Sequence, residues 1–307
     1  MSVKTRFLVI SDTHTSSFEI KSGVKADVVI HCGDLTDGSK LDEYRRTLQL
    51  LRDFDAPLKL VIAGNHDFTL DTPTFRRMLD EASEPLDPDL VQKVYGNYGQ
   101  ARGLFDKAHD IHFLDEGTHS FSLPSGTFSN RYHPESQHQF TIGKDVDVVI
   151  THGPPHGIMD MTHSQRAGCP QLFRAIARAR PRLHCFGHIH EGWGAKLVAW
   201  REQITENPSH FTEIDNDRST VIDKLSNITG TKFDTPESRA KKRYNTEQYI
   251  QQGYRATSHC TGDQIRLEHG VHTLFVNVAV EGITNELPLQ PPWIVDINLP
   301  LIHNSTP

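Results

Sequence analysis

Ala63-Gly64-Asn65-His66-Asp67 follows the apolar run at residues 58–62, and the chain is organised around it. The stretch places an amide, an imidazole and a carboxylate on a predicted turn after a predicted strand, where side chains can converge on one ligand. Because Gly-Asn pairs also occur in ordinary turns, the stretch alone decides little. Its significance comes from four other stretches that carry ligand-type side chains, each at the end of an apolar run.

These four stretches are Ser11-Asp12-Thr13-His14 after run 7–10, Gly33-Asp34 after run 27–32, Thr151-His152-Gly153 after run 145–150, and Gly187-His188-Ile189-His190 after run 183–186. Short apolar runs that end abruptly in polar residues are typical of buried parallel strands. Extended backbone after the first run would place Asp12 and His14 on the same side.

Helical spacing of apolar residues predicts a helix over 41–51, between the second and third strands. The order strand, helix, strand predicts a largely parallel sheet with helices on its faces. Helices are also expected over 74–82 and 169–180, and further strands at 183–186 and 273–280. We expect 111–114 and 120–123 to form short strands of a second sheet. Because of its prolines, 291–295 is predicted to close the chain as an edge strand.

Composition indicates a soluble globular protein, since 36% of the 307 residues are hydrophobic and 23% are charged. We expect a single domain over 1–307 with a polar, solvated insertion at about 199–267. The basic cluster at 239–243 leaves a nuclear-import or RNA-contact patch open. The formal net charge of −7 makes nucleic acid an unlikely partner. No uncharged apolar run approaches the ~20 residues of a membrane span, so a cytoplasmic location without membrane partners is expected. The oligomeric state stays open.

Eight side chains from the five stretches can meet at the strand ends: Asp12, His14, Asp34, Asn65, His66, His152, His188 and His190. Imidazole and carboxylate together suit Zn, Fe, Mn or Co, whereas Ca and Mg prefer oxygen ligands. Taken singly, each histidine is best explained as a hydrogen-bonded structural residue. Taken together, the set is large enough for two metal ions that share one aspartate.

The five stretches, in this order, resemble the motifs of the calcineurin-like metallophosphoesterase superfamily. The resemblance covers residues 7–190. The motif sequences are most similar to those of the metallophosphoesterase-domain-containing branch, which resembles phosphodiesterases. It implies an α/β fold: a four-layer sandwich of two mixed β-sheets flanked by helices, with a dimetal site at the C-terminal ends of the strands.

The resemblance also implies how two divalent transition metal ions are held. One ion is expected to bind Asp12, His14, Asp34 and His190, and the other Asp34, Asn65, His152 and His188. Two such ions against two carboxylates leave the site about two units positive, which suits a phosphate ester. The ions are expected to polarise the phosphoryl oxygens and to generate a bridging hydroxide that attacks phosphorus. The metals are Mn, Fe or Zn, and the ligand types do not decide between them.

The resemblance implies that Asn65 and His66 contact the substrate and that His66 stabilises the phosphate charge or protonates the leaving oxygen. We infer that His66 is the general acid and that Asp67 holds its ring in the required tautomer. Gly64 is interpreted as leaving room for the phosphate. Segment 121–140 lacks the aromatic, Ser-Pro-Tyr-like sequence that the family leads us to expect, which leaves the shape of the substrate pocket open.

The predicted function is therefore hydrolysis of a phosphoester, with cyclic nucleotides or similar small phosphodiesters as the first substrate class. A phosphomonoesterase or Ser/Thr protein phosphatase is the alternative. A low-activity nucleotide-binding regulatory protein is the second alternative, and the presence of His66 and His188 argues against it.

Overall fold

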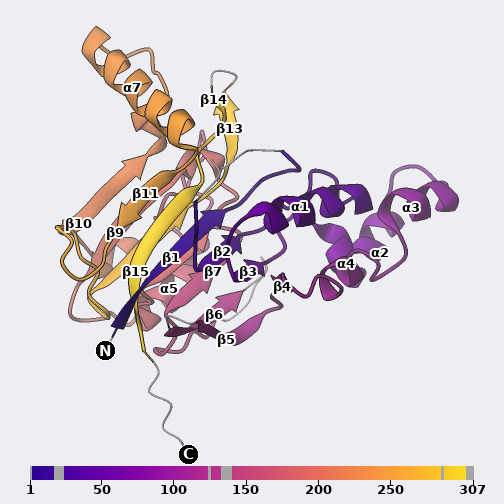
Figure 1. Cartoon of the computed structure of the whole chain (residues 1–307), viewed down its shortest axis with the longest axis horizontal. Helices are drawn as coiled ribbons and strands as arrows, with labels where there is room; N and C mark the ends of the chain where they lie inside the picture. Colours follow the sequence, from indigo (N-terminus) through magenta and orange to yellow (C-terminus); the bar gives the residue numbers. More distant parts are fainter. Residues whose placement is uncertain (1, 17–23, 124–125, 133–139, 285–286, 302–307) are drawn as a thin grey trace, which may run out of the picture.

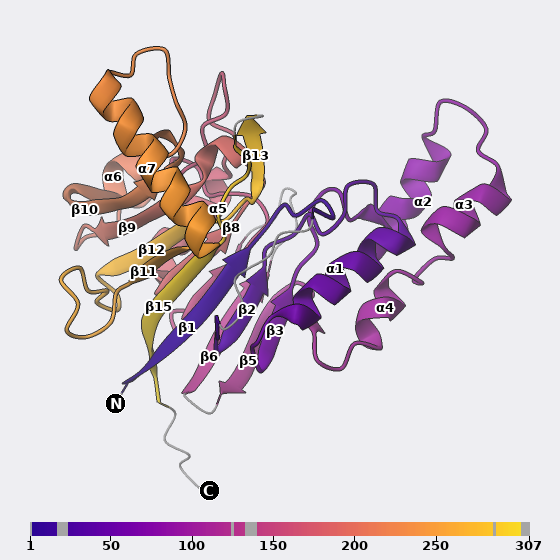
Figure 2. The same cartoon turned by 45° about the horizontal axis from the view of Figure 1, so that its top comes forward.

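Two mixed β-sheets stack face to face in this protein, and helices cover their outer faces (Figures 1 and 2). The computed structural model describes residues 2–16, 24–123, 126–132, 140–284 and 287–301. The arrangement confirms the α/β sandwich of two mixed sheets that the sequence led us to expect.

The first sheet has the strand order β11-β15-β1-β2-β3-β4. Its strands are β1 (Ser2–Ile10), β2 (Val28–His31), β3 (Leu58–Val61), β4 (His112–Phe113), β11 (Arg255–Ser258) and β15 (Trp293–Pro300). Strands β1 to β4 run parallel, and β15 is antiparallel to β1.

Two strand predictions are wrong in this sheet. The last strand does not lie at an edge, because β15 pairs with β1 on one side and β11 on the other. Pro291 and Pro292 precede the strand, so neither has to donate a hydrogen bond within it. Strand β4 joins β3 of the first sheet, whereas 120–123 falls in the second sheet.

The second sheet has the order β10-β9-β12-β8-β7-β6-β5. Its strands are β5 (Gly117–Leu123), β6 (Gly126–Tyr132), β7 (Val148–Ile150), β8 (Leu183–Phe186), β9 (Gly194–Trp200), β10 (Ile214–Lys224) and β12 (His272–Asn277). Strands β6, β7, β8 and β12 run parallel, and the others pair antiparallel. A separate pair, β13 (Glu281–Thr284) and β14 (Leu287–Leu289), lies beyond the sheets.

The alternating side chains of β1 show how the layers are held together. Phe7 and Val9 pack between the sheets with Val148 of β7, whereas Leu8 and Ile10 face the helix layer. That layer contains α1 (Leu41–Asp53), α2 (Thr72–Asp80), α3 (Pro88–Tyr95) and α4 (Arg102–Asp106). On the other side, α5 (Pro170–Ala179) packs against the second sheet, with α6 (His210–Glu213) beside it.

The predicted helices over 41–51, 74–82 and 169–180 correspond to α1, α2 and α5. The sequence analysis missed α3, since Pro88 and Gly96 read as helix breakers. In the structure they delimit the helix: Pro88 is its first residue, and Gly96 ends it with a φ of 81°.

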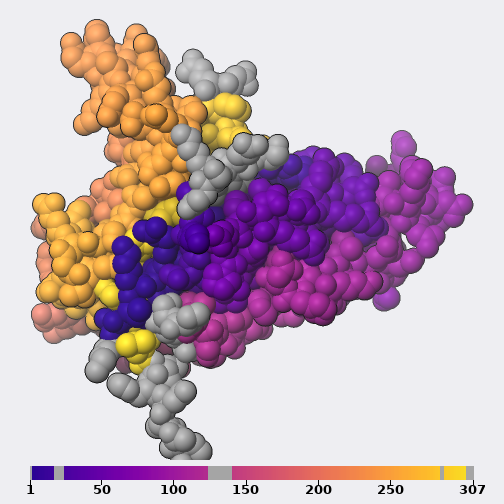
Figure 3. Space-filling view, in the orientation of Figure 1, coloured from indigo at the N-terminus to yellow at the C-terminus, as the bar shows by residue number. Residues whose placement is uncertain are grey.

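The polar segment 199–267 contributes β10 to one sheet and β11 to the other, and it contains α7 (Pro236–Gln252). The segment is fastened by the buried Asp223, whose carboxylate accepts hydrogen bonds from Asn227, Tyr249 and Arg255. None of the side chains of α7 is buried, and the helix stands out as the orange projection in the space-filling view (Figure 3). Among the described residues, no helix combines the length and apolar character needed to cross a membrane.

Candidate active site

The five polar stretches meet where the C-terminal ends of parallel strands from both sheets come together. In the first sheet, β1 leads to Asp12, β2 to Asp34 and β3 to Asn65; in the second, β7 leads to His152 and β8 to His188 and His190. Because the strands of each sheet are parallel here, their polar ends share one side of the sandwich. The site is therefore shared between the sheets.

The loops after these strands are sharply bent. Asp12, His14, Asp34 and His188 have φ angles of 54°, 42°, 53° and 67°, in the left-handed region that side chains rarely adopt. Such residues cost about 1–3 kcal/mol each and gather at functional sites. The backbone at Asp12 and His14 is therefore not extended as expected, although the two side chains do reach the same group of candidate ligands.

Glycines allow these loops to pack against each other. A Cβ at Gly33 would lie 2.7 Å from Nδ1 of His152, and one at Gly64 would lie 2.8 Å from Cγ of Asp34. A Cβ at Gly187 would overlap the carboxylate of Asp12. Gly64 is thus required by its closeness to another loop of the site, and that it also leaves room for a phosphate stays a prediction.

The structure brings the candidate metal ligands together in two groups: Asp12 with His14 and His190, and Asp34 with His152 and His188. Within each group, the possible ligand atoms all lie within 4.8 Å of one another. The grouping is compatible with the division between two ions in the sequence analysis, although the role of each residue as a ligand stays a prediction.

A third group combines His14 and His66 with Asp37, which the sequence analysis did not single out. Asp37 lies three residues after Asp34. This closeness to Asp34 in sequence is the signal that could have pointed to Asp37 as part of the site.

The hydrogen bonds of His152 show that the second group suits a cation. Its Nδ1 donates to the carbonyl oxygen of Cys32 at 2.9 Å, so Nε2 of the neutral ring presents a lone pair. That lone pair lies 2.8 Å from Oδ1 of Asn65 and 3.3 Å from Oδ2 of Asp34. Three acceptor atoms that converge in this way need a positive charge between them. The donor set fits a transition metal ion, because it combines imidazole with oxygen ligands.

The electrostatics of the site point the same way. Burial opposes protonation of His152, but its hydrogen bond and ion pair with Asp34 outweigh this and raise the pKa of His152 to about 10. When no ion is bound, a proton on Nε2 therefore supplies the positive charge that Asn65 and Asp34 attract. Burial alone would raise the pKa of Asp12; its hydrogen bond with His190 and the charge of His152 instead hold that pKa well below the ordinary range. The backbone N–H of His188 donates to both oxygens of Asp12 at 3.0 Å. The carboxylates of Asp12 and Asp34, whose pKa values are both lowered, are thus kept ionised.

The contacts of Asp67 differ from those expected. Its two carboxylate oxygens accept hydrogen bonds from the backbone N–H groups of Leu35, Thr36 and Gly64 and from the Thr36 hydroxyl, at 2.8–3.1 Å. The imidazole of His66 instead donates from Nδ1 to the carbonyl oxygen of Asp37 at 2.6 Å. The inference that Asp67 orients His66 is therefore wrong: Asp67 joins the loops after β2 and β3, and the backbone of Asp37 holds the ring.

Two buried histidines support the loops from behind. Nε2 of His31 lies 3.0 Å from the hydroxyl of Thr13, and Nε2 of His184 lies 2.9 Å from that of Thr151. Burial lowers the pKa of both imidazoles to about 3, so both are neutral. Each bonded threonine directly precedes a candidate metal ligand in the sequence. These two histidines therefore have a structural role.

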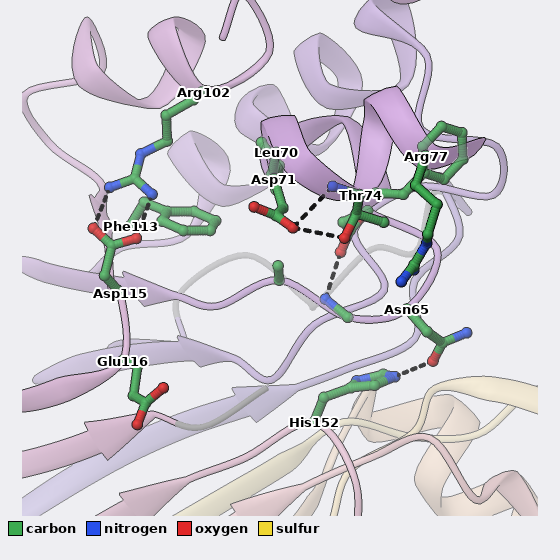
Figure 4. Close-up of a pocket in the computed structure, with 14 residues that line it drawn as sticks. Asn65, Leu70, Asp71, Thr74, Arg77, Arg102, Phe113, Asp115, Glu116 and His152 are labelled. Atoms are coloured by element: carbon green, nitrogen blue, oxygen red, sulfur yellow. Dashed lines mark hydrogen bonds and ion pairs between the residues drawn. The ribbon is translucent and has the colours of Figure 1, made fainter. Parts of the chain in front are cut away.

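A cavity of about 500 Å³ opens beside the second group, and Asn65 and His152 form part of its wall (Figure 4). Phe113 lines the same cavity, and Arg102 lies over its ring while pairing with Asp115 at 2.6 and 2.8 Å. Figure 4 shows the side chain of Arg77 reaching down toward Asn65. Within the atypical segment 121–140, residues 124–125 and 133–139 lie outside the described part of the chain.

Comparisons with known proteins agree with this geometry. Residues 5–192 match the family model of the calcineurin-like phosphoesterases. The human metallophosphoesterase domain-containing protein 1 is 32% identical over 203 residues, which are 62% of each chain. A UPF0046 protein of Caenorhabditis elegans is 32% identical over 222 residues, covering 65% of this chain and 54% of the relative. The chain thus spans less than two thirds of the length of these relatives.

Among solved structures, a Thermus thermophilus protein, TT1561, aligns with a TM-score of 0.37 at 11% identity, over 60% of this chain and 81% of that one. The purple acid phosphatase PPD1 of yellow lupin aligns with the same TM-score at 14% identity, over 66% and 40%. The family model, by contrast, matches more than half of the chain and includes every candidate metal ligand. The chain therefore belongs to the calcineurin-like phosphoesterase family, which implies a dinuclear site for divalent metal ions.

Proposed function

We propose that this protein is a phosphodiesterase that hydrolyses cyclic nucleotides or similar small phosphodiesters. In this proposal, one ion is held by Asp12, His14, Asp34 and His190, and the other by Asp34, Asn65, His152 and His188. The observation that carries the proposal is the convergence of acceptor atoms at His152, Asn65 and Asp34 beside an open cavity.

The cavity supports a small diester as substrate. Its volume of about 500 Å³ falls within the ~300–1,000 Å³ of small-molecule sites. A diester bound at Asn65 has a second alcohol group to place, and the cavity begins at that residue. Phe113 offers an apolar wall for this group, and the exposed Arg77 offers a positive charge.

The chemistry divides between the ions and the side chains. When bound, two divalent ions supply Lewis-acid catalysis, neutralising phosphate charge and acidifying water. The amide of Asn65 is exposed to solvent and can orient the phosphate by hydrogen bonding. Because Nδ1 of His66 donates to the carbonyl of Asp37, Nε2 is the ring nitrogen left for the leaving oxygen, and it can deliver a proton there when the ring is the doubly protonated imidazolium.

Hydrolysis of bis-p-nitrophenyl phosphate and of p-nitrophenyl phosphate, measured side by side with added Mn²⁺, tests the proposal. We expect kcat/KM for the diester to exceed that for the monoester by about tenfold or more, a difference of about 1.4 kcal/mol in transition-state stabilisation. Cyclic nucleotides should then be cleaved under the same conditions. A higher value for the monoester would instead favour a phosphomonoesterase. Absence of hydrolysis by protein that has bound metal would favour a nucleotide-binding regulatory protein.

A further inference from the structure

Glu281 is a carboxylate at the edge of the site that neither the sequence motifs nor the family match singles out. It is the first residue of β13, and its Oε2 lies 3.1 Å from Nε2 of His14 and 3.9 Å from Nδ1 of His190. Both imidazoles belong to the group formed with Asp12. We propose that Glu281 is an additional ligand for the ion at this group, an inference that rests on the dimetal site proposed above.

The hydrogen bonding of His14 explains why a cation belongs between these side chains. Its Nδ1 donates to the carbonyl oxygen of Thr36 at 3.1 Å, so Nε2 of the neutral ring presents a lone pair. The carboxylate of Glu281 presents lone pairs as well, and two acceptors at 3.1 Å repel each other unless either a proton on the ring or a metal ion joins them. The arrangement repeats the convergence of acceptors seen at His152.

The backbone that carries Glu281 is tied to the loops of the site. The N–H of Val280 donates to the carbonyl of Ser11 at 2.9 Å, directly before Asp12. The buried Gln290 donates from Nε2 to the carbonyls of Glu281 and His190, at 2.9 and 3.2 Å. The backbone at Glu281 is therefore held close to Asp12 and His190.

Charge gives this ligand a measurable effect. Two divalent ions against Asp12 and Asp34 leave about two positive units, and Glu281 reduces this to about one. The side chain of Glu281 is 45% exposed, so its carboxylate can turn toward water when no ion is bound. Removal of a side chain that supports a metal site typically lowers metal affinity by about 10–100-fold.

The test is a calorimetric titration of the chelator-stripped 307-residue protein with Mn²⁺, comparing the wild type with Glu281→Gln and Glu281→Asp. We expect Glu281→Gln to weaken one of the two binding events by about tenfold or more and to leave the other unchanged. Glu281→Asp keeps the negative charge, so its affinity for Mn²⁺ should lie between those of the wild type and Glu281→Gln. Glu191→Gln is the matched control, since Glu191 is adjacent to His190 in sequence but pairs with His163 at 2.6 Å.

The outcomes separate this inference from the proposed function. Two binding events of unchanged affinity in Glu281→Gln would overturn the ligand role and reduce the contact with His14 to a local ion pair. The ligand role would also be overturned if Glu191→Gln lowered the affinity for Mn²⁺ as much as Glu281→Gln does. If the wild type itself bound no Mn²⁺, the dimetal hydrolase would fail first, and the role of Glu281 with it.

Discussion

Replacement of Gly64 by alanine tests how tightly the loops of the site are packed. The new Cβ would lie 2.8 Å from Cγ of Asp34, whereas carbon atoms in contact are about 3.5–4.0 Å apart. Oδ1 and the backbone N of Asp34 would be closer still, so Asp34 and its loop must move by more than about 1 Å. Asp34 is buried and its Oδ1 also accepts a hydrogen bond from the N–H of His66, so the shift would carry over to His66. A displacement of this size can lower turnover by about 10²-fold, which equals about 2.7 kcal/mol.

Turnover of the diester and metal content by elemental analysis should be measured on the same preparation of Gly64→Ala. Overpacking of this kind also costs about 1–3 kcal/mol of stability, so thermal unfolding must confirm that the variant is folded at the assay temperature. Gly230→Ala is the control, because a Cβ there meets no atom within 4 Å. Wild-type turnover and metal content in folded Gly64→Ala would refute the argument from packing.

Three further predictions concern other parts of the molecule. His66→Ala should keep both metal ions by elemental analysis but lose about 10²–10⁴-fold in kcat; normal turnover would remove its role as proton donor. Burial raises the pKa of Asp147 to about 6, above its ordinary 3.8, so its protonated form favours folding. This contribution is complete below pH 3.8 and is lost as the pH rises through 6. Over that range, the free energy of unfolding measured with urea should fall by up to about 3 kcal/mol more in the wild type than in Asp147→Asn. Equal pH dependence of the unfolding free energy in the two proteins would contradict this prediction. Asp223→Ala leaves Tyr249 and Arg255 without their shared acceptor and should lower stability by about 3 kcal/mol in the same assay, and an unchanged unfolding midpoint would show that Asp223 does not fasten the segment.

The elements of the fold that could be predicted are those with a local signal. An apolar run that stops at a polar loop located β1, β2, β3, β7 and β8, and helical spacing located α1 and α5. The side chains at the ends of these runs are the ones that the structure brings together. Parallel strands align their ends, so a local pattern is enough to indicate a shared site.

Features that depend on distant parts of the chain could not be predicted. The inner position of β15 is set by its pairing with β1, almost 290 residues away in sequence. Asp67 is adjacent to His66 in sequence, yet its partners come from Leu35 and Thr36 as well as Gly64. Glu281 follows no motif and reaches the site only because the backbone next to it is bonded to Ser11. Adjacency in sequence therefore did not predict contacts between residues that only folding brings together.

The sharing of the site between two sheets has a consequence for the mechanics of the fold. Asp34 comes from the first sheet, while His152 and His188 come from the second, so an ion held by this group is a cross-link between the layers. A cation that binds only when both layers are docked transfers its binding free energy to the folded state. The apolar interface between the sheets and the bound metal ions would then both oppose separation of the two layers.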